Sequence, residues 1–246
     1  MFSYEKNKRR MWEIDFLRGI AIVLMIDFHY AWFLNYFGFV SVDLNNLFWG
    51  GIARFVELTF ITLVGVSLTL SYSKLRNRND IFGKNLLRGL KILGCAVIVT
   101  IASYFLVPDN YVIFGVLHLI GVGIILASFF IEFGLLNLAL GMAAIAVGFL
   151  FEGLTANTGW LIWFGIRYPS FSSMDYFPIF PWFGLILIGI YLGNTFYPSG
   201  KRKITIRTKP NRLESVMCFL GRNSLLIYFL HIMIITAIIY LMASIP

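Results

Sequence analysis

Long apolar runs alternate with short polar stretches along the whole chain. The apolar runs cover about 15–37, 52–73, 89–107, 112–131, 135–151, 178–197 and 222–243. A hydrocarbon core about 30 Å thick requires about 20 residues of helix, and most of the runs approach that length. We therefore expect an all-α transmembrane bundle of about seven spans, forming a single integral membrane domain over 1–246.

The basic residues indicate an orientation for this bundle. With the N-terminus inside, 18 of the 20 Lys and Arg residues fall on the inner side: at the N-terminal end up to Arg18, in 74–91 and in 201–222. Only Arg54 and Arg167 fall outside, and the C-terminus is expected outside as well. Topology and contact with anionic lipid headgroups explain the net charge of +8, so nucleic acid is not an expected partner.

Composition supports the membrane class. Hydrophobic residues make up 59% of the chain and charged residues 13%, with a mean hydropathy of +0.81, which excludes a soluble domain and indicates a multi-pass protein of the cell membrane. The first span lacks a small-residue cleavage site and is too long for a signal peptide, so we expect it to be retained. Cys95 and Cys218 have no CxxC spacing and indicate neither a disulfide nor a metal site.

The first span carries ionisable residues, each of which costs roughly 2.5–3.5 kcal/mol inside a membrane on insertion scales and therefore indicates function or a buried partner. At about 100° per residue, Arg18 and His29 lie within about 20° of one another on a helix, about 16 Å apart. Asp15 and Tyr36 share this face. Asp27 points to roughly the opposite side.

Depth in the membrane is expected to bring residues of different spans together. His29 lies about 21 Å from the inner edge, and Glu57 and His118 reach about 21–22 Å on their own spans. We expect these three side chains to converge on a cavity in the outer half. His231 lies nearer the midplane, at about 14 Å. Alternatively, His118 or His231 is a core imidazole bonded to a backbone carbonyl. No metal site is expected, because the histidines lie on different helices without a local ligand pair.

The segments between spans differ in character. Residues 201–212 have no apolar period and are expected to form a solvated inner loop. The outer segment 152–177 is rich in aromatic residues, with Arg167 and Asp175 as polar groups, and is expected to lie at the interface as a lid or acceptor platform. Its aromatic residues are Trp160, Trp163, Phe164, Tyr168 and Phe171.

Two resemblances follow from these residues. Asp15-Phe-Leu-Arg18-Gly-Ile-Ala with His29, an Arg-x10-His arrangement, resembles the first-span signature of the acyltransferase-3 membrane acyltransferases. The wider chain resembles the heparan-alpha-glucosaminide N-acetyltransferase catalytic-domain family, including its prokaryotic members. The blocks that carry this resemblance are EIDFLRGIAIVLMIDFH, 59–71, 114–123, 175–193 and 221–231. Lysosomal-type members have a catalytic His in the loop after the first span, and residues 37–51 here contain none, which favours the Arg-x10-His arrangement.

The resemblance implies a membrane-embedded acyltransferase that moves an acyl group, in particular acetyl, from coenzyme A to a hydroxyl or amine acceptor at the outer side. Acyl transfer requires a base and donors for the developing oxyanion. We expect His29 to be the base, with Glu57 or His118 orienting it or protonating the leaving group. The Arg18 guanidinium suits phosphates near the inner edge, and Arg88 extends this basic entrance.

Further residues complete the expected site. Asp15 joins Arg18 on the donor side, and the acceptor side is assigned to Arg54, Arg167, Asp175 and Tyr36. Acyl-CoA is expected as a co-substrate, with no tightly bound cofactor. Membrane lipids are the other expected partner.

The sequence is also compatible with two functions other than catalysis. A proton-coupled transporter or permease would also explain the intramembrane His, Glu and Asp residues, although no inverted repeat is found between the two halves. A third alternative is a scaffold whose polar residues only hold helices together. The acceptor is left open among a sugar, a lipid and an amine, and so is a homo-oligomer.

Overall fold

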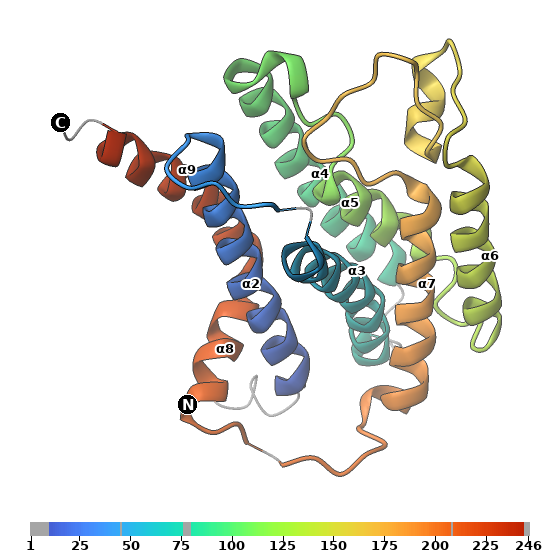
Figure 1. The fold of residues 1–246 in the computed structure, drawn as a ribbon. Helices are drawn as coiled ribbons and strands as arrows, with labels where there is room; N and C mark the ends of the chain where they lie inside the picture. Colours follow the sequence, from blue (N-terminus) through green and yellow to red (C-terminus); the bar gives the residue numbers. More distant parts are fainter. Residues whose placement is uncertain (1–9, 45, 76–79, 208, 244–246) are drawn as a thin grey trace. The chain divides into compact units, whose positions relative to one another are not determined.

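The computed structural model describes residues 10–44, 46–75, 80–207 and 209–243, which form helices joined by loops (Figure 1). These described residues contain no strand and only two isolated β-bridges, so the all-α class is confirmed. The chain divides into two compact units, Met1–Phe60 with Ile206–Pro246, and Ile61–Thr205. The single domain expected over 1–246 stays a prediction.

The first unit contains α2 (Trp12–Tyr36), the first part of α3 (Leu47–Leu75), α8 (Arg212–Arg222) and α9 (Ser224–Ala243). Its buried core is formed by Ile22 and Met25 of α2 with Val56 of α3, and Phe60, Leu220 and Tyr228 pack against it. Apolar residues from all four helices therefore enclose the middle of α2, where His29 follows Met25 by one turn.

Helices α2 and α8 are in backbone contact. A Cβ added to Gly19 would collide with the carbonyl of Met217, and one added to Gly221 would collide with the carbonyl of Asp15. Small residues at a crossing let two backbones approach this closely, which is the common way for membrane helices to pack. The pairing places α8 against the end of α2 that carries Asp15 and Arg18.

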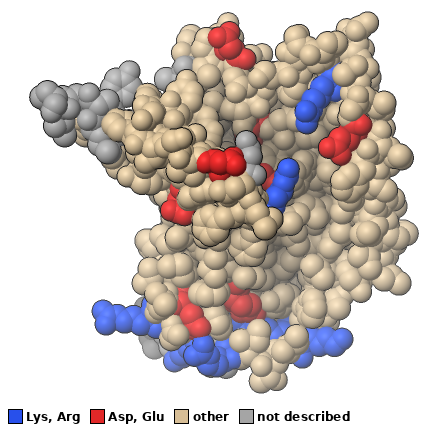
Figure 2. All heavy atoms as spheres, viewed as in Figure 1, with Lys and Arg blue, Asp and Glu red and all other residues tan. Residues whose placement is uncertain are grey.

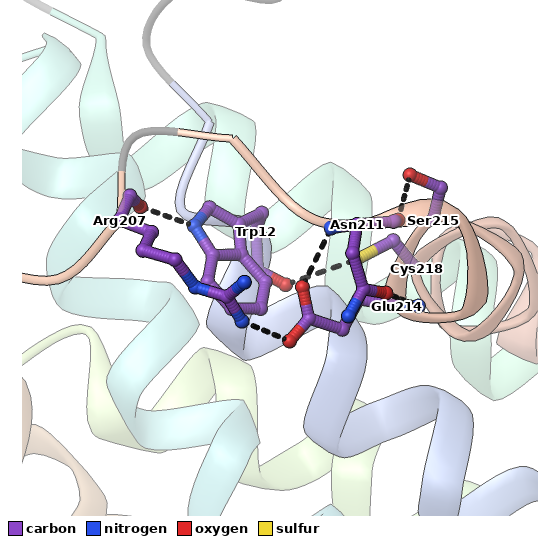
Figure 3. A network of polar contacts seen from close by, with 6 residues as sticks. All are labelled: Trp12, Arg207, Asn211, Glu214, Ser215 and Cys218. Atoms are coloured by element: carbon purple, nitrogen blue, oxygen red, sulfur yellow. Dashed lines mark hydrogen bonds and ion pairs between the residues drawn. The ribbon is translucent and has the colours of Figure 1, made fainter.

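Helix α8 starts within the stretch that was expected to be an inner loop or the edge of a span. Asn211 Oδ1 accepts from the Glu214 N–H at 2.8 Å and Glu214 Oε2 accepts from the Asn211 N–H at 2.7 Å, which forms a capping box (Figure 3). The Trp12 indole donates to the Arg207 carbonyl at 2.9 Å, and the Cys218 thiol donates to the Trp12 carbonyl at 3.3 Å. These bonds tie the start of α2 to the segment around α8.

The second unit consists of the rest of α3 and the helices α4 to α7. Their bounds are α4 Ile81–Leu106, α5 Val116–Ala127, α6 Leu136–Phe151 and α7 Ile179–Phe196, with short 3-10 turns at Pro108–Asn110, Gly159–Phe164 and Pro198–Gly200. The core of this unit is fully buried around Ile61, Leu119 and Ile186. Helix α4 starts at Ile81 and not near 89, because a polar first turn that includes Lys84 continues as helix.

Glycines again mark the helix crossings of the second unit. A Cβ on Gly141 of α6 would lie 2.8 Å from the Gly184 carbonyl of α7, and one on Gly189 of α7 would collide with the Thr62 carbonyl of α3. The small residues at 141–148 and at 189–193 thus lie at close helix contacts.

In the part of the chain that the structure describes, four helices are long and apolar enough to cross a membrane: α2, α3, α4 and α7. A fifth crossing is formed if Arg212–Arg222 and Ser224–His231, which meet at a bend of 72°, count as one span. The remaining two predicted spans correspond to the shorter apolar helices α5 and α6. The count of seven spans and the orientation stay predictions, and Lys6, Lys8, Arg9, Arg76 and Arg78, on which the orientation partly rests, lie outside the described residues.

The surface agrees with this class. Most of the face drawn in Figure 2 is uncharged. Large apolar side chains are exposed on the long helices, among them Ile98, Phe105, Phe48 and Leu58. In water such a surface would be strongly unfavourable, whereas in a bilayer it contacts lipid.

Candidate active site

His29 on α2 is held by the backbone one turn before it. Its Nδ1 lies 2.8 Å from the Met25 carbonyl oxygen. A carbonyl can only accept, so the ring proton is on Nδ1, and Nε2 carries a lone pair. In neutral His29, Nε2 is therefore the nitrogen that can accept a proton. Glu57 or His118 was expected to orient His29 or to protonate the leaving group, and both roles stay predictions; the partner that the structure shows for His29 Nδ1 is the Met25 carbonyl of the same helix.

His231 of α9 lies against His29. The two ring centroids are 4.9 Å apart and the rings are inclined at 79°. His231 Nδ1 donates to the Tyr228 carbonyl at 2.7 Å, and its side chain is 4% exposed. The depth estimate placed His231 about 7 Å below His29, and the ring contact shows that the two side chains nevertheless meet. Their depths in a membrane stay a prediction.

Glu57 of α3 is paired with Arg54 of the same helix. The Arg54 guanidinium lies 2.9 Å from Glu57 Oε2, one turn away, and the Arg54 side chain is 69% exposed. An i, i+3 pair of opposite charges is a common local stabilising contact. Among the described residues the hydrogen-bond partner of Glu57 is thus Arg54, and no bond joins Glu57 to His29.

His118 lies in the second unit, at the start of α5. The Gly115 N–H donates to His118 Nδ1 at 3.2 Å, so the ring proton is on Nε2, which lies 3.5 Å from Thr100 Oγ1. The Thr100 hydroxyl itself donates to the Val112 carbonyl at 2.8 Å. Both His118 nitrogens therefore have partners, as in the core-imidazole alternative, although those partners differ from the single carbonyl expected. The convergence of His118 with His29 stays a prediction, since the two lie in different units.

The donor-side residues of the first unit form an ion-pair cluster. Asp15 is buried, with Arg10 Nε at 2.8 Å from one carboxylate oxygen and the Arg18 guanidinium at 3.7 Å from the other. Asp15 thereby fixes two guanidinium groups near the start of α2. Arg88 is exposed on α4 in the second unit, and its part in donor binding stays a prediction.

Arg167, one of the residues assigned to the acceptor side, is exposed in the second unit. Its guanidinium carbon lies 5.2 Å from the centre of the Tyr176 ring, a cation–π contact. Burial raises the pKa of Tyr176 from 10.0 to about 12, against the opposite effect of Arg167, and the Tyr176 hydroxyl donates to the Ile162 carbonyl at 2.6 Å. An open cavity of about 210 Å³ is lined by Arg167, Phe171, Ser172, Ser173 and Tyr176.

The remaining acceptor-side residues have other surroundings. Asp175 Oδ2 accepts from the Val116 N–H at 3.1 Å, which places a carboxylate at the start of α5, a favourable position for negative charge. Tyr36 stacks on Trp32 with ring centroids 5.1 Å apart. Trp160 is 82% exposed in the 3-10 turn Gly159–Phe164. The position of this segment at the outer membrane interface stays a prediction.

Two local features of the first unit are predictable from residue spacing in the sequence, whereas the contact between the two histidines is not. Asn211 and Glu214 have the spacing of a capping box, which predicts the start of α8. Arg54 and Glu57 have the i, i+3 spacing of a local pair. Nothing in the sequence indicates that His231 contacts His29. Among the described residues, no three His, Cys, Asp or Glu side chains are grouped to hold a metal ion.

Apolar helices long enough to cross a bilayer define a multi-pass membrane protein, and one of its units contains a histidine pair and an ion-pair cluster on these helices. Comparison with protein families adds the class of reaction. The sequence model of the heparan-alpha-glucosaminide N-acetyltransferase catalytic family matches residues 10–233, and the chain belongs to this family. The family is that of a membrane acetyltransferase, which does not support the transporter alternative. Neither the curated proteins nor the solved structures return a match.

Proposed function

We propose that this protein transfers an acetyl group from acetyl-CoA, entering from the inner side, to a hydroxyl or amine acceptor at the outer side of the membrane. The observation that carries the proposal is the state of His29. Its proton is held on Nδ1 by the Met25 carbonyl, so Nε2 presents a lone pair within the membrane. The family supplies the acetyl-transfer chemistry that such a base would serve.

Two residues of α2 have separate parts in the proposed reaction. Arg18 contacts the phosphates of the donor, because a guanidinium binds phosphate oxygens in a planar, forked arrangement. Asp15, at 3.7 Å, orients Arg18 and does not itself contact the phosphates. His29 lies about 16 Å further along the helix, within the length of an extended coenzyme A molecule.

The proposed chemical step is a direct transfer. His29 Nε2 takes the proton of the acceptor's O–H or N–H as its oxygen or nitrogen attacks the thioester carbonyl. The C–S bond then breaks, and the coenzyme A thiolate takes the proton back from the His29 imidazolium. The products are the acetylated acceptor and free coenzyme A, and His29 returns to its starting state.

The test uses the purified full chain in lipid nanodiscs with radiolabelled acetyl-CoA and a panel of amino sugars, neutral sugars, lipid alcohols and amines. We expect label transfer to at least one acceptor, together with release of free thiol. We also expect acetyl-CoA to raise the melting temperature, since a ligand at 100 times its Kd stabilises the folded state by about 2.7 kcal/mol. Melting that responds to free sugars or amino acids but not to the thioester would contradict the proposal.

A further inference from the structure

His231 carries a buried polar atom that the proposed reaction leaves unused. The side chain is 4% exposed, its Nδ1–H donates to the Tyr228 carbonyl, and its Nε2 has no hydrogen-bond partner among the described residues. A buried acceptor without a donor costs about 1–3 kcal/mol, and native proteins keep few of them. The Nε2 of His231 is therefore expected to receive a donor from a bound molecule.

The neighbouring imidazole cannot supply that donor. The His29 and His231 ring centroids are 4.9 Å apart, but each ring carries its single proton on the Nδ1 that donates to a backbone carbonyl. Both Nε2 atoms are consequently acceptors. Two acceptors on neighbouring rings suit a molecule that carries more than one N–H or O–H group.

We propose that His231 is a positioning residue of the acyl-transfer site: its Nε2 accepts a hydrogen bond from a second N–H or O–H of the acceptor molecule and holds the reacting group against His29. The inference rests on the proposed function. The proton transferred in the reaction still goes to His29, and His231 stays neutral throughout. The second donor is the other N–H of an amine or a hydroxyl adjacent to the reacting one.

Two variants of His231 separate positioning from a merely structural role. In His231→Asn the side-chain amide reaches the position of Nδ1, so the bond to the Tyr228 carbonyl is retained and the Nε2 acceptor is lost. In His231→Gln the longer side chain brings an amide oxygen to the level of Nε2, so the acceptor is retained and the bond to Tyr228 is lost. The two changes therefore remove one hydrogen bond each.

We expect His231→Asn to raise KM for the acceptor roughly 10- to 100-fold, as for a lost bond to a desolvated group, while KM for acetyl-CoA is unchanged. His231→Gln should stay within about tenfold of the unaltered chain, the effect of about 1.4 kcal/mol. The opposite order, with Asn active and Gln inactive, would show that the Tyr228 bond is what matters and would overturn the inference.

Direct binding distinguishes this inference from the proposed function. Calorimetry without acetyl-CoA should show acceptor binding to the unaltered chain and weaker binding to His231→Asn, even if no transfer occurs. Transfer that is indifferent to His231→Asn would overturn the positioning role and leave the function standing. Absence of both binding and transfer would overturn both.

A measurement on the unaltered chain covers the case in which neither variant folds. In protein labelled with ¹⁵N-histidine, the acceptor should shift the Nε2 resonance of His231 towards that of a hydrogen-bonded nitrogen. An unchanged Nε2 resonance at saturating acceptor would overturn the inference.

Discussion

Replacing Arg18 by lysine should weaken donor binding without impairing the base. The substitution keeps the positive charge but replaces a planar group with five N–H donors by a single ammonium. Arg18 lies one turn from Asp15, with 3.7 Å between guanidinium and carboxylate, and its side chain is 20% exposed. Because it is largely shielded from water, a lost contact to a phosphate is not readily replaced by solvent.

The structure sets the size of the expected effect. A hydrogen bond to a charged group contributes about 1.5–3 kcal/mol, so losing one of two such bonds should raise the Kd of coenzyme A about 10- to 100-fold. Arg18→Gln removes the charge as well and should weaken binding further. Arg10→Lys is the matched control, because Arg10 pairs with the same carboxylate at 2.8 Å and is not assigned to the donor.

Isothermal titration calorimetry in nanodiscs measures these constants, with coenzyme A and its 3′-dephospho analogue as ligands. If Arg18 contacts the phosphate that the analogue lacks, the two changes act on one contact. The loss of binding free energy for Arg18→Lys with the analogue should then differ from the sum of the two separate losses. A Kd for Arg18→Lys within twofold of the unaltered chain, in a folded protein, would refute the phosphate assignment. Arg18 would then serve only as a partner of Asp15.

Three further predictions concern stability. Gly221→Ala should destabilise the protein by roughly 1–3 kcal/mol, since its Cβ meets the Asp15 carbonyl, and a melting curve that does not shift would contradict the crossing. Burial raises the pKa of Tyr176 to about 12, so the contribution of the neutral phenol to the free energy of unfolding is present below pH 10 and is lost as pH rises towards 12. Tyr176→Phe should flatten this alkaline loss of stability, and a pH profile identical to that of the unaltered chain would contradict the prediction. Asn211→Ala should cost about 1 kcal/mol in chemical denaturation by removing the cap that pairs with Glu214, whereas Asn211→Asp should be near neutral.

The hydrophobic pattern predicts the helices well, and the reasons for its errors are physical. All seven apolar runs overlap helices, because burial in lipid requires every backbone group to bond within the segment. Helix α8 was missed because hydropathy measures apolar content, whereas α8 is defined by a cap at Asn211 and by a glycine contact at Gly221. The start of α4 at Ile81 precedes the apolar run at 89–107, because charged residues such as Lys84 in its first turns lower the hydropathy without ending the helix.

The candidate site was less predictable than the fold. The apolar run over 15–37 correctly places Arg18 and His29 on one helix, since both lie within α2, and their shared face stays a prediction. Depth estimates did not indicate the contact of His231 with His29, because depth along a span does not determine which faces of two helices meet. Which carbonyl orients His29, and which residue pairs with Glu57, depends on side-chain direction within a turn and not on depth.

The base assignment of His29 is tested most directly by comparing transfer and donor binding in His29→Ala with those in Asp27→Asn. Asp27 lies two residues earlier on the same helix and is exposed, so its substitution alters charge without touching the proposed site. We expect His29→Ala to bind coenzyme A with an unchanged Kd and to transfer acetyl roughly 10²–10⁴-fold more slowly, the usual effect of losing a general base. Asp27→Asn should match the unaltered chain in both. Equal transfer rates for His29→Ala and Asp27→Asn would contradict the account.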